Sequence, residues 1–280
     1  MTSPTNDPPQ PPYPTHAALE AAKQFVSHTP NGLKLLFWPL NADTSPALET
    51  SGLAVMAAGP KHPDPDVRTP YYDAAAGAWH PVSQRPISEP RVSEIVVRSW
   101  DVSDWARSWS ELHRECADGG FEVSAAERGE GWVEGGCRGC GAVRPPVPEG
   151  DVSVVVRGTG GVGEGEGEGE GEGGGYVTVH DYVSTVHPWL VGLRGDILGA
   201  VGTTSGNNAP LPAQTELMVS CRLMDKLRAE EREDWFRNAR KKPSPGSSLG
   251  ELLGPRVEAH LGPFAGLPSF MLQPKGPRRE

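Results

Sequence analysis

Apolar residues recur at helical spacing in four stretches of this chain. The clearest stretch begins after Thr178, a candidate helix N-cap with Asp181 three residues later, which is a variant of the capping box. It predicts a helix whose buried face consists of Val179, Val183, Val186, Leu190 and Leu193. Pro188 lies inside this helix and removes one backbone hydrogen bond, so we expect a kink there.

Three other stripes predict further helices. The first begins at Thr15 as N-cap and ends near Ser27, with an apolar face of Ala18, Ala22 and Phe25. The second has Asp101 or Ser103 as N-cap, and its face consists of Trp105, Trp109, Leu112 and Cys116. The third runs from about Gln214 to Lys242, with a buried face of Leu217, Cys221, Met224 and Leu227.

Short apolar or β-branched segments predict strands over residues 33–40, 91–98, 151–157 and 176–179. The last two flank a run of alternating Gly and Glu, so we expect a hairpin with a long loop, since each doubling of loop length costs only about 0.6 kcal/mol. Residues 41–90 show no sustained period. They predict long surface loops, anchored by Tyr71, Tyr72 and Trp79.

Together these elements predict an α+β fold: a small antiparallel sheet packed by several helices, with long disordered loops and tails. The composition limits how much of the chain can fold, because 35 of the 280 residues are Gly, 29 are Pro and only 36% are hydrophobic. We therefore expect one domain with additions. These are a Pro-rich disordered tail over residues 1–14, a domain over 15–273, insertions at about 117–150 and 159–175, and a basic tail over 274–280.

Charge and cysteine content narrow the class of protein. Half of the formal net charge of −10 comes from the glutamates of the Gly-Glu tract, and the modest acidity of the remainder argues against nucleic acid as the main partner. No stretch approaches about 18 consecutive apolar residues, so we expect no membrane span. The first residues are polar and Pro-rich, unlike a secretory signal, and four Cys are too sparse for a disulfide scaffold. The expectation is a soluble intracellular protein, in the cytoplasm or the nucleus.

Cys137 and Cys140, followed by Gly141, have the spacing of a zinc knuckle, in which two thiolates on a tight turn bind one metal ion. His113 and Cys116 would complete a tetrahedral set. The competing interpretation is that Cys116, which lies on an apolar helical stripe, is an ordinary core residue. Zinc is therefore the alternative hypothesis, and no residue is assigned as a metal ligand.

His180, Asp181 and His187 suggest acid–base chemistry or metal binding, because the two histidines are seven residues apart and lie on similar sides of one helix. Asp181 already has a structural role in the cap, and no nucleophile or catalytic motif accompanies the three residues. Residues 158–163 match the spacing of a dinucleotide-binding loop, but alternating Gly and Glu follow where that site needs a helix. We assign no catalytic residue and no cofactor.

The order of several segments resembles an uncharacterised fungal domain family. The resemblance rests on the strand at residues 151–157, the passage 176–183 into a helix, the charged helix ending at Arg240, and the closing segment 264–272, and it spans about residues 85–273. It implies a small α+β domain and brings no activity or ligand.

The function predicted from the sequence is a non-enzymatic binding or scaffold module with an unidentified protein partner. A zinc-stabilised module is the alternative, and a hydrolase or transferase centred on His180 and Asp181 is a weaker one.

Overall fold

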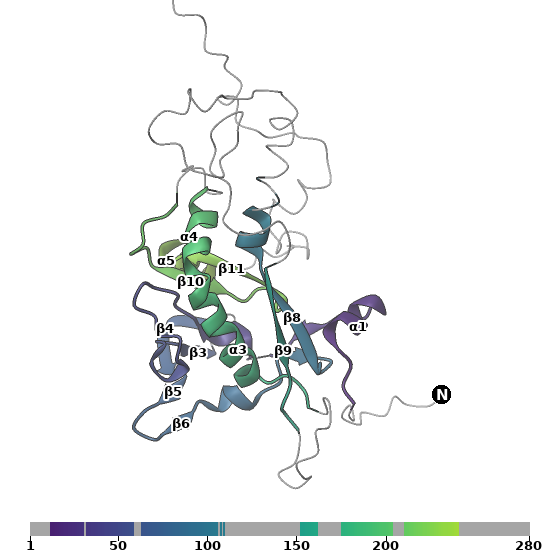
Figure 1. Ribbon diagram of the computed structural model, residues 1–280. Coiled ribbons are helices and arrows are strands. Elements are labelled where there is room, and N and C mark those ends of the chain that lie inside the picture. Colours follow the sequence, from purple (N-terminus) through teal and green to yellow (C-terminus); the bar gives the residue numbers. More distant parts are fainter. Residues whose placement is uncertain are drawn as a thin grey trace, which may run out of the picture. The chain divides into compact units, whose positions relative to one another are not determined.

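A mixed four-stranded sheet forms one layer of the protein, in the order β10 (Leu217–Ser220), β11 (Lys226–Glu231), β8 (Glu94–Ser99) and β9 (Ser153–Arg157) (Figure 1). The computed structural model describes residues 12–30, 32–58, 63–105, 107, 109, 152–161, 175–203 and 210–240. Neighbouring strands of this sheet are antiparallel except β11 and β8, which are parallel. The predicted α+β class is confirmed, with several small sheets where one was expected.

Strands β8 and β9 lie where the β-branched segments predict them. Ile95 pairs with Val156 in the antiparallel register, and both side chains are buried. At the end of the pair, Glu94 forms an ion pair with Arg157 at 3.1 Å. Alternation of buried and half-buried residues along β8 gives the sheet one face toward the main core.

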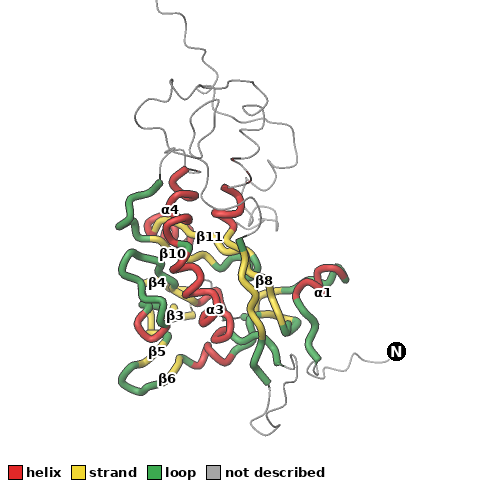
Figure 2. The backbone as a smooth tube through the Cα atoms, viewed as in Figure 1, coloured by secondary structure: helices red, strands yellow, loops and turns green. Residues whose placement is uncertain are grey.

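Helix α3 (Val179–Gly192) packs against β9, and α4 (Arg194–Gly202) follows it beside the sheet (Figure 2). The predicted capping box is present: the Thr178 hydroxyl accepts from the Asp181 amide at 3.1 Å, and the Asp181 carboxylate accepts from the Thr178 amide at 2.9 Å. Four residues of the predicted stripe are buried, namely Val179, Val183, Val186 and Leu190. The sequence therefore specifies both the start and the buried face of this helix.

The described parts of the segment 41–90, residues 41–58 and 63–90, are folded, and the expectation of long surface loops was wrong for them. Strands β2 (Leu36–Phe37), β3 (Ala54–Ala58) and β4 (Pro63–Pro70) form an antiparallel sheet, and β5 (Tyr72–Asp73) pairs with β6 (Ala78–Trp79). The other short elements of this part of the chain are β1 (Ser27–His28) paired with β7 (Ser88–Glu89), and the 3-10 turns η1 (Leu33–Leu35), η2 (Leu48–Thr50) and η3 (Pro81–Gln84).

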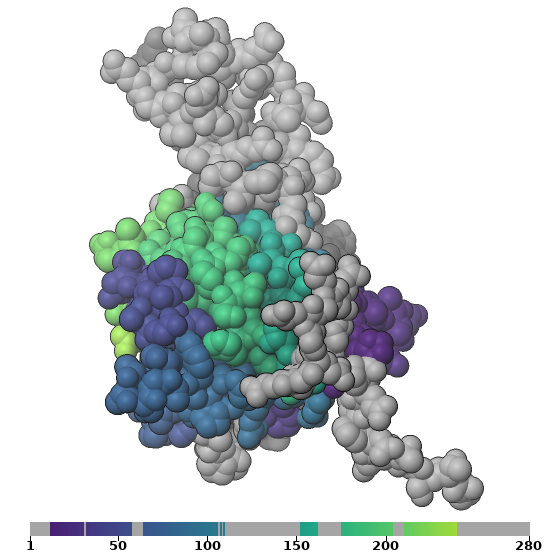
Figure 3. Space-filling model, turned by 60° about the horizontal axis from the view of Figure 1, so that its bottom comes forward, coloured from purple at the N-terminus to yellow at the C-terminus, as the bar shows by residue number. Residues whose placement is uncertain are grey.

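These strands escaped prediction because most of them are only a few residues long and alternation has no room to show. The buried Tyr71 and half-buried Trp79 do anchor the segment, with ring centroids 5.6 Å apart. In the space-filling view the blue surface of this segment lies directly beside the green surface of α3 and α4 (Figure 3), and α3 contacts both η2 and η3.

The prediction of a single long helix over residues 214–242 was also wrong, because the segment forms the hairpin of β10 and β11 followed by α5 (Arg232–Arg240). The helical spacing from Leu217 to Leu227 arises by coincidence from two strands and the turn between them. All of β10 is buried, so it lacks the alternation that would have marked it as a strand. Cys221 follows β10 in the core, where burial raises the pKa of its thiol to about 12.

The N-terminal helix is shorter than predicted. Helix α1 (His16–Ala21) begins at the expected cap, where the Thr15 hydroxyl accepts from the Ala18 amide at 3.1 Å. His16 and Leu19 form its buried face, whereas Phe25 lies beyond the helix with 73% of its surface exposed.

Residues 33–40 form a 3-10 turn followed by the short strand β2, with Trp38 and Leu40 buried beyond it. The strand predicted for this segment is thus confirmed only over two residues.

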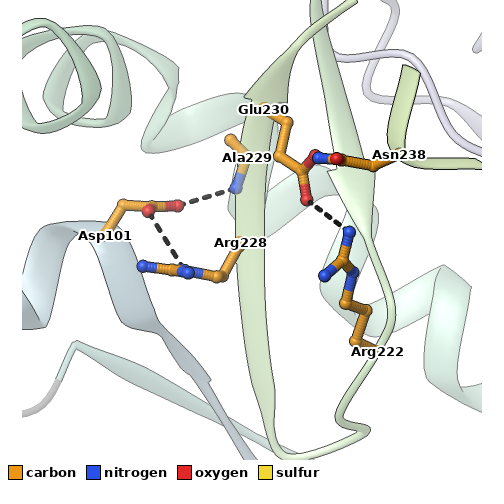
Figure 4. A network of polar contacts seen from close by, with 6 residues as sticks. All are labelled: Asp101, Arg222, Arg228, Ala229, Glu230 and Asn238. Atoms are coloured by element: carbon orange, nitrogen blue, oxygen red, sulfur yellow. Dashed lines mark hydrogen bonds and ion pairs between the residues drawn. The ribbon is translucent and has the colours of Figure 1, made fainter. Parts of the chain in front are cut away.

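The helix predicted to start at Asp101 or Ser103 begins at residue 100, so neither residue is its N-cap. Their side chains instead hold neighbouring strands. One Asp101 carboxylate oxygen accepts from the Ala229 amide of β11 at 2.7 Å, and the other lies 3.9 Å from Arg228 (Figure 4). The Ser103 hydroxyl accepts from the Val152 amide at 3.1 Å, just before β9. This helix therefore joins both sides of β8 through polar contacts.

The ends of the Gly-Glu tract meet, but the predicted hairpin is reduced to one antiparallel bridge. Gly160 and Tyr176 exchange two backbone hydrogen bonds of 2.9 and 2.8 Å. Residue 177 then turns to bond Val92, so no strand forms over 176–179. Gly158 is required here, because a Cβ atom would lie 2.2 Å from the Tyr176 carbonyl carbon. The elements predicted within residues 1–11, 110–151, 162–174 and 241–280 lie outside the described residues.

Candidate ligand-binding site

His187, one of the three candidate functional residues on α3, is fully buried in the core. The Trp38 indole N–H donates to its Nδ1 at 2.9 Å, which places the ring proton on Nε2. Nε2 lies 2.8 Å from the Ser45 carbonyl oxygen and donates to it. Burial lowers the pKa of His187, so the ring is neutral and both of its nitrogens are satisfied.

His180 lies in an aromatic cluster at the start of α3. Its ring centroid is 4.7 Å from that of Trp79, and its Nδ1 is 3.5 Å from the Tyr71 hydroxyl. Burial, and secondarily the charge of Asp181, raises the pKa of Tyr71 well above its ordinary value, so this hydroxyl stays protonated near neutral pH.

The Asp181 carboxylate is occupied by hydrogen bonds that hold backbone in place. It accepts from the amide and hydroxyl of Thr178, at 2.9 and 2.8 Å. It also accepts from the amide and hydroxyl of Thr159, at 3.1 and 2.7 Å. These four bonds join the start of α3 to the chain leaving β9, which gives Asp181 a structural role.

The structure does not assemble the three residues into one site. Among the described residues, no hydrogen bond joins His180, Asp181 and His187 to one another, and no group of three or more His, Cys, Asp or Glu is placed to hold a metal ion. The predicted zinc ligands His113, Cys116, Cys137 and Cys140 lie outside the described residues, so the zinc hypothesis stays a prediction.

A cavity of about 330 Å³ opens where β3 and β4 meet η3. An irregularity in the strand pairing borders it: Met56 pairs with Arg68, but the next residue, Ala57, pairs with Asp64. Residues 65–67 of β4 therefore have no partner opposite them and bulge from the ladder. Bulges re-aim side chains, and here Val67 and Arg68 line the cavity.

Apolar side chains form most of the cavity wall. They come from η1, the two strands and the η3 segment, and they include Leu35, Val55, Met56, Val67, Pro81 and Val82. Leu35, Val55 and Val82 belong to the main core, so the cavity is a recess in packed structure with a rigid floor.

The polar part of the wall consists of Arg68, Thr69, His80 and Arg85. The Arg68 guanidinium lies over the Phe37 ring, 3.9 Å from its centroid, and Arg85 donates one bond of 3.3 Å to the Pro30 carbonyl. Neither guanidinium forms an ion pair with any carboxylate in the described part of the chain. Both retain unused donors.

His80 has a fixed tautomer. Its Nδ1 accepts from the Val82 amide at 3.1 Å and so caps η3, which leaves the proton on Nε2. Burial lowers the pKa of His80, so the ring is neutral near physiological pH. It therefore presents one N–H donor.

None of the cavity residues was singled out from the sequence. Their segment has no motif and no period, because the lining is collected from four short elements whose pairing is set by the fold. The available signal was weak: a Pro-Asp-Pro-Asp run at residues 63–66, typical of an interrupted strand, followed directly by Val67 and Arg68.

No family model matches the chain, and neither curated proteins nor solved structures give a match. The resemblance to an uncharacterised fungal domain family therefore stays a prediction. In the part of the chain that the structure describes, no helix is long and apolar enough to cross a membrane.

Proposed function

We propose that this protein is a non-enzymatic binding module that takes a small ligand in the cavity between β3, β4 and η3. The observation that carries the proposal is the cavity itself, in which a mostly apolar wall converges with a few fixed polar groups. That combination is typical of small-molecule sites, and about 330 Å³ lies at the lower end of their size range.

The state of two of the three candidate catalytic residues, His187 and Asp181, supports binding over catalysis. His187 and Asp181 have their polar atoms engaged by Trp38, Ser45, Thr159 and Thr178. A general acid or base needs a free polar atom within reach of substrate, which these contacts do not leave. The binding of a small ligand in the cavity does not require a protein partner, and the partner expected from the sequence stays a prediction.

A fragment screen tests the proposal. The full chain is screened by saturation-transfer NMR against small apolar and amphipathic compounds, in parallel with two variants. Ala57→Leu adds bulk at the cavity wall, and Ala75→Leu adds the same bulk on the exposed turn between β5 and β6. We expect hits that Ala57→Leu abolishes and Ala75→Leu retains. A screen without hits, or hits that ignore Ala57→Leu, would refute the proposal.

A further inference from the structure

We infer that the ligand of the β3–β4–η3 cavity is a small amphipathic carboxylate: a short apolar body ending in one carboxylate. The inference rests on the binding function proposed above and names its ligand class. It follows from three properties of the lining: the hydrogen-bond donors that it offers, its charge, and the size of its apolar part.

Three of the four polar side chains of the cavity, those of Arg68, His80 and Arg85, can only donate hydrogen bonds to a ligand. Arg68 and Arg85 have no acceptor atoms in their side chains. His80 uses its acceptor nitrogen on the Val82 amide, so only its N–H is left to face a ligand. The Thr69 hydroxyl donates to the Val55 carbonyl at 3.5 Å, so it adds no free donor to these three groups. A ligand group that accepts several hydrogen bonds and donates none satisfies this set best, and a carboxylate does so.

The lining carries positive charge, which favours the same kind of ligand group as its hydrogen-bond donors do. Two guanidinium groups lie at one cavity without a carboxylate partner among the described residues, in a protein whose formal net charge is −10. The nearest acidic residues of β4, Asp64 and Asp66, do not line the cavity; the Asp64 carboxylate accepts from the Asp66 amide at 2.9 Å. Planar guanidinium groups match the two oxygens of a carboxylate, so the favoured headgroup is that anion.

The apolar wall limits the remainder of the ligand. Leu35, Val55 and Val82 are buried core side chains, so an alkyl or aryl body placed against them leaves water for a dry surface. The cavity volume of about 330 Å³ lies at the lower end of the range for small-molecule sites, which favours a short body such as an alkyl chain of about eight carbons.

Calorimetric titration of the full chain with three matched probes tests the inference. Octanoate carries the predicted headgroup, 1-octanol is its neutral analogue and octylamine is its cationic analogue. We expect octanoate to bind at least about tenfold more tightly than either analogue, and its affinity to fall as salt is raised, because the headgroup contacts are partly exposed.

Variants connect the preference to the guanidinium groups. Arg85→Gln should weaken octanoate at least about tenfold and leave 1-octanol unchanged, while Arg157→Gln, a matched change on β9 outside the cavity, should alter neither. Arg85 makes one exposed backbone contact, so its replacement does not threaten the fold. Arg68→Gln removes the contact with Phe37 as well, and Arg68→Lys, which keeps the charge, is its control.

The outcomes separate the ligand class from the binding function. If octanoate and 1-octanol bind equally and Ala57→Leu abolishes both, the cavity binds ligands but the carboxylate inference is wrong. Tighter binding of octylamine, or an octanoate affinity insensitive to Arg85→Gln, also overturns the inference. If no probe binds and the fragment screen gives no ligand sensitive to Ala57→Leu, the proposed binding function fails with it.

Discussion

Replacing Asp101 with asparagine should stabilise this protein at neutral pH. The Asp101 side chain is only 11% exposed, and burial raises the pKa of its carboxyl group from an ordinary 3.8 to about 6, despite the opposing hydrogen bond from Ala229 and charge of Arg228. The folded protein thus holds the proton more tightly than the unfolded chain. The contribution of protonated Asp101 to the stability of the fold is fully present below the unfolded pKa of 3.8 and is lost as the pH rises through 6.

The size of the effect follows from the two pKa values. Since one pKa unit corresponds to about 1.36 kcal/mol, ionising Asp101 costs the fold about 3 kcal/mol. Asparagine has nearly the same shape, keeps an oxygen to accept from the Ala229 amide, and does not ionise. The free energy of unfolding of Asp101→Asn relative to wild type should therefore rise by about 2 kcal/mol between pH 4 and pH 7, because a small part of the effect is already present at pH 4.

The variant must be compared with the wild type at each pH, because the titration of His28 changes the stability of both proteins in the opposite direction over the same pH range. Burial, and then the charge of Lys34, lowers the pKa of His28 to about 4. Its contribution to stability is present above pH 6.5 and is lost as the pH falls through 4. The two groups partly cancel in the wild-type profile, whereas the difference between wild type and the Asp101 variant contains only the aspartate.

Urea unfolding followed by tryptophan fluorescence at several pH values between 4 and 7.5 measures this difference. Asp101→Ala is the matched control: it should show the same slope with pH, displaced by the about 1–3 kcal/mol lost when the buried Ala229 amide has no acceptor. A difference for Asp101→Asn that is constant with pH, or that falls toward neutral pH, would refute the argument.

Three further predictions concern the core and the Gly-Glu tract. Trp38→Phe removes the donor to the buried Nδ1 of His187 and should lower the free energy of unfolding by about 1–3 kcal/mol in urea titrations; unchanged stability would contradict the assigned tautomer. Gly158→Ala places a methyl group against the backbone of Tyr176 and should cost about 1–3 kcal/mol by thermal denaturation, whereas a loss below about 0.5 kcal/mol would show that the chain shifts freely there. Replacing residues 162–174 with Gly-Ser-Gly-Ser should raise stability by about 1 kcal/mol in urea, because it shortens a loop whose ends already meet; a clear decrease would mean that the tract contributes contacts of its own.

Elements with strong local signals could be predicted from the sequence. Thr178 and Asp181 mark the start of α3 because a capping box involves only residues three apart, and the valines that follow specify its buried face. Strands β8 and β9 were predicted for a similar reason, since their β-branched content is dense enough to be read without knowledge of their partners.

The remaining elements depend on partners distant in the chain. The strand Leu217–Ser220 is buried on both faces, because Leu217 and Val219 face the main core while Met218 packs in the second cluster with Trp235. A fully buried strand has the same apolar run as a buried helix. The cavity was invisible for a related reason. Arg68, His80 and Arg85 are ordinary surface residues in sequence, and only the bulge in β4 and the position of η3 bring them to one recess.

The parallel pairing of β11 with β8 has a consequence for synthesis of the chain. Lys226 pairs with Arg98, so the ribosome adds 128 more residues after Arg98 before this partner is made. At about 5–20 residues per second, that takes on the order of ten seconds. During that interval Arg98 and Ser99, the two residues of β8 that pair with β11, have no partner strand on that edge, and unpaired strand edges favour association with other chains. A nascent chain that has made β8 and has not yet reached β11 therefore has an open strand edge that chaperones would protect.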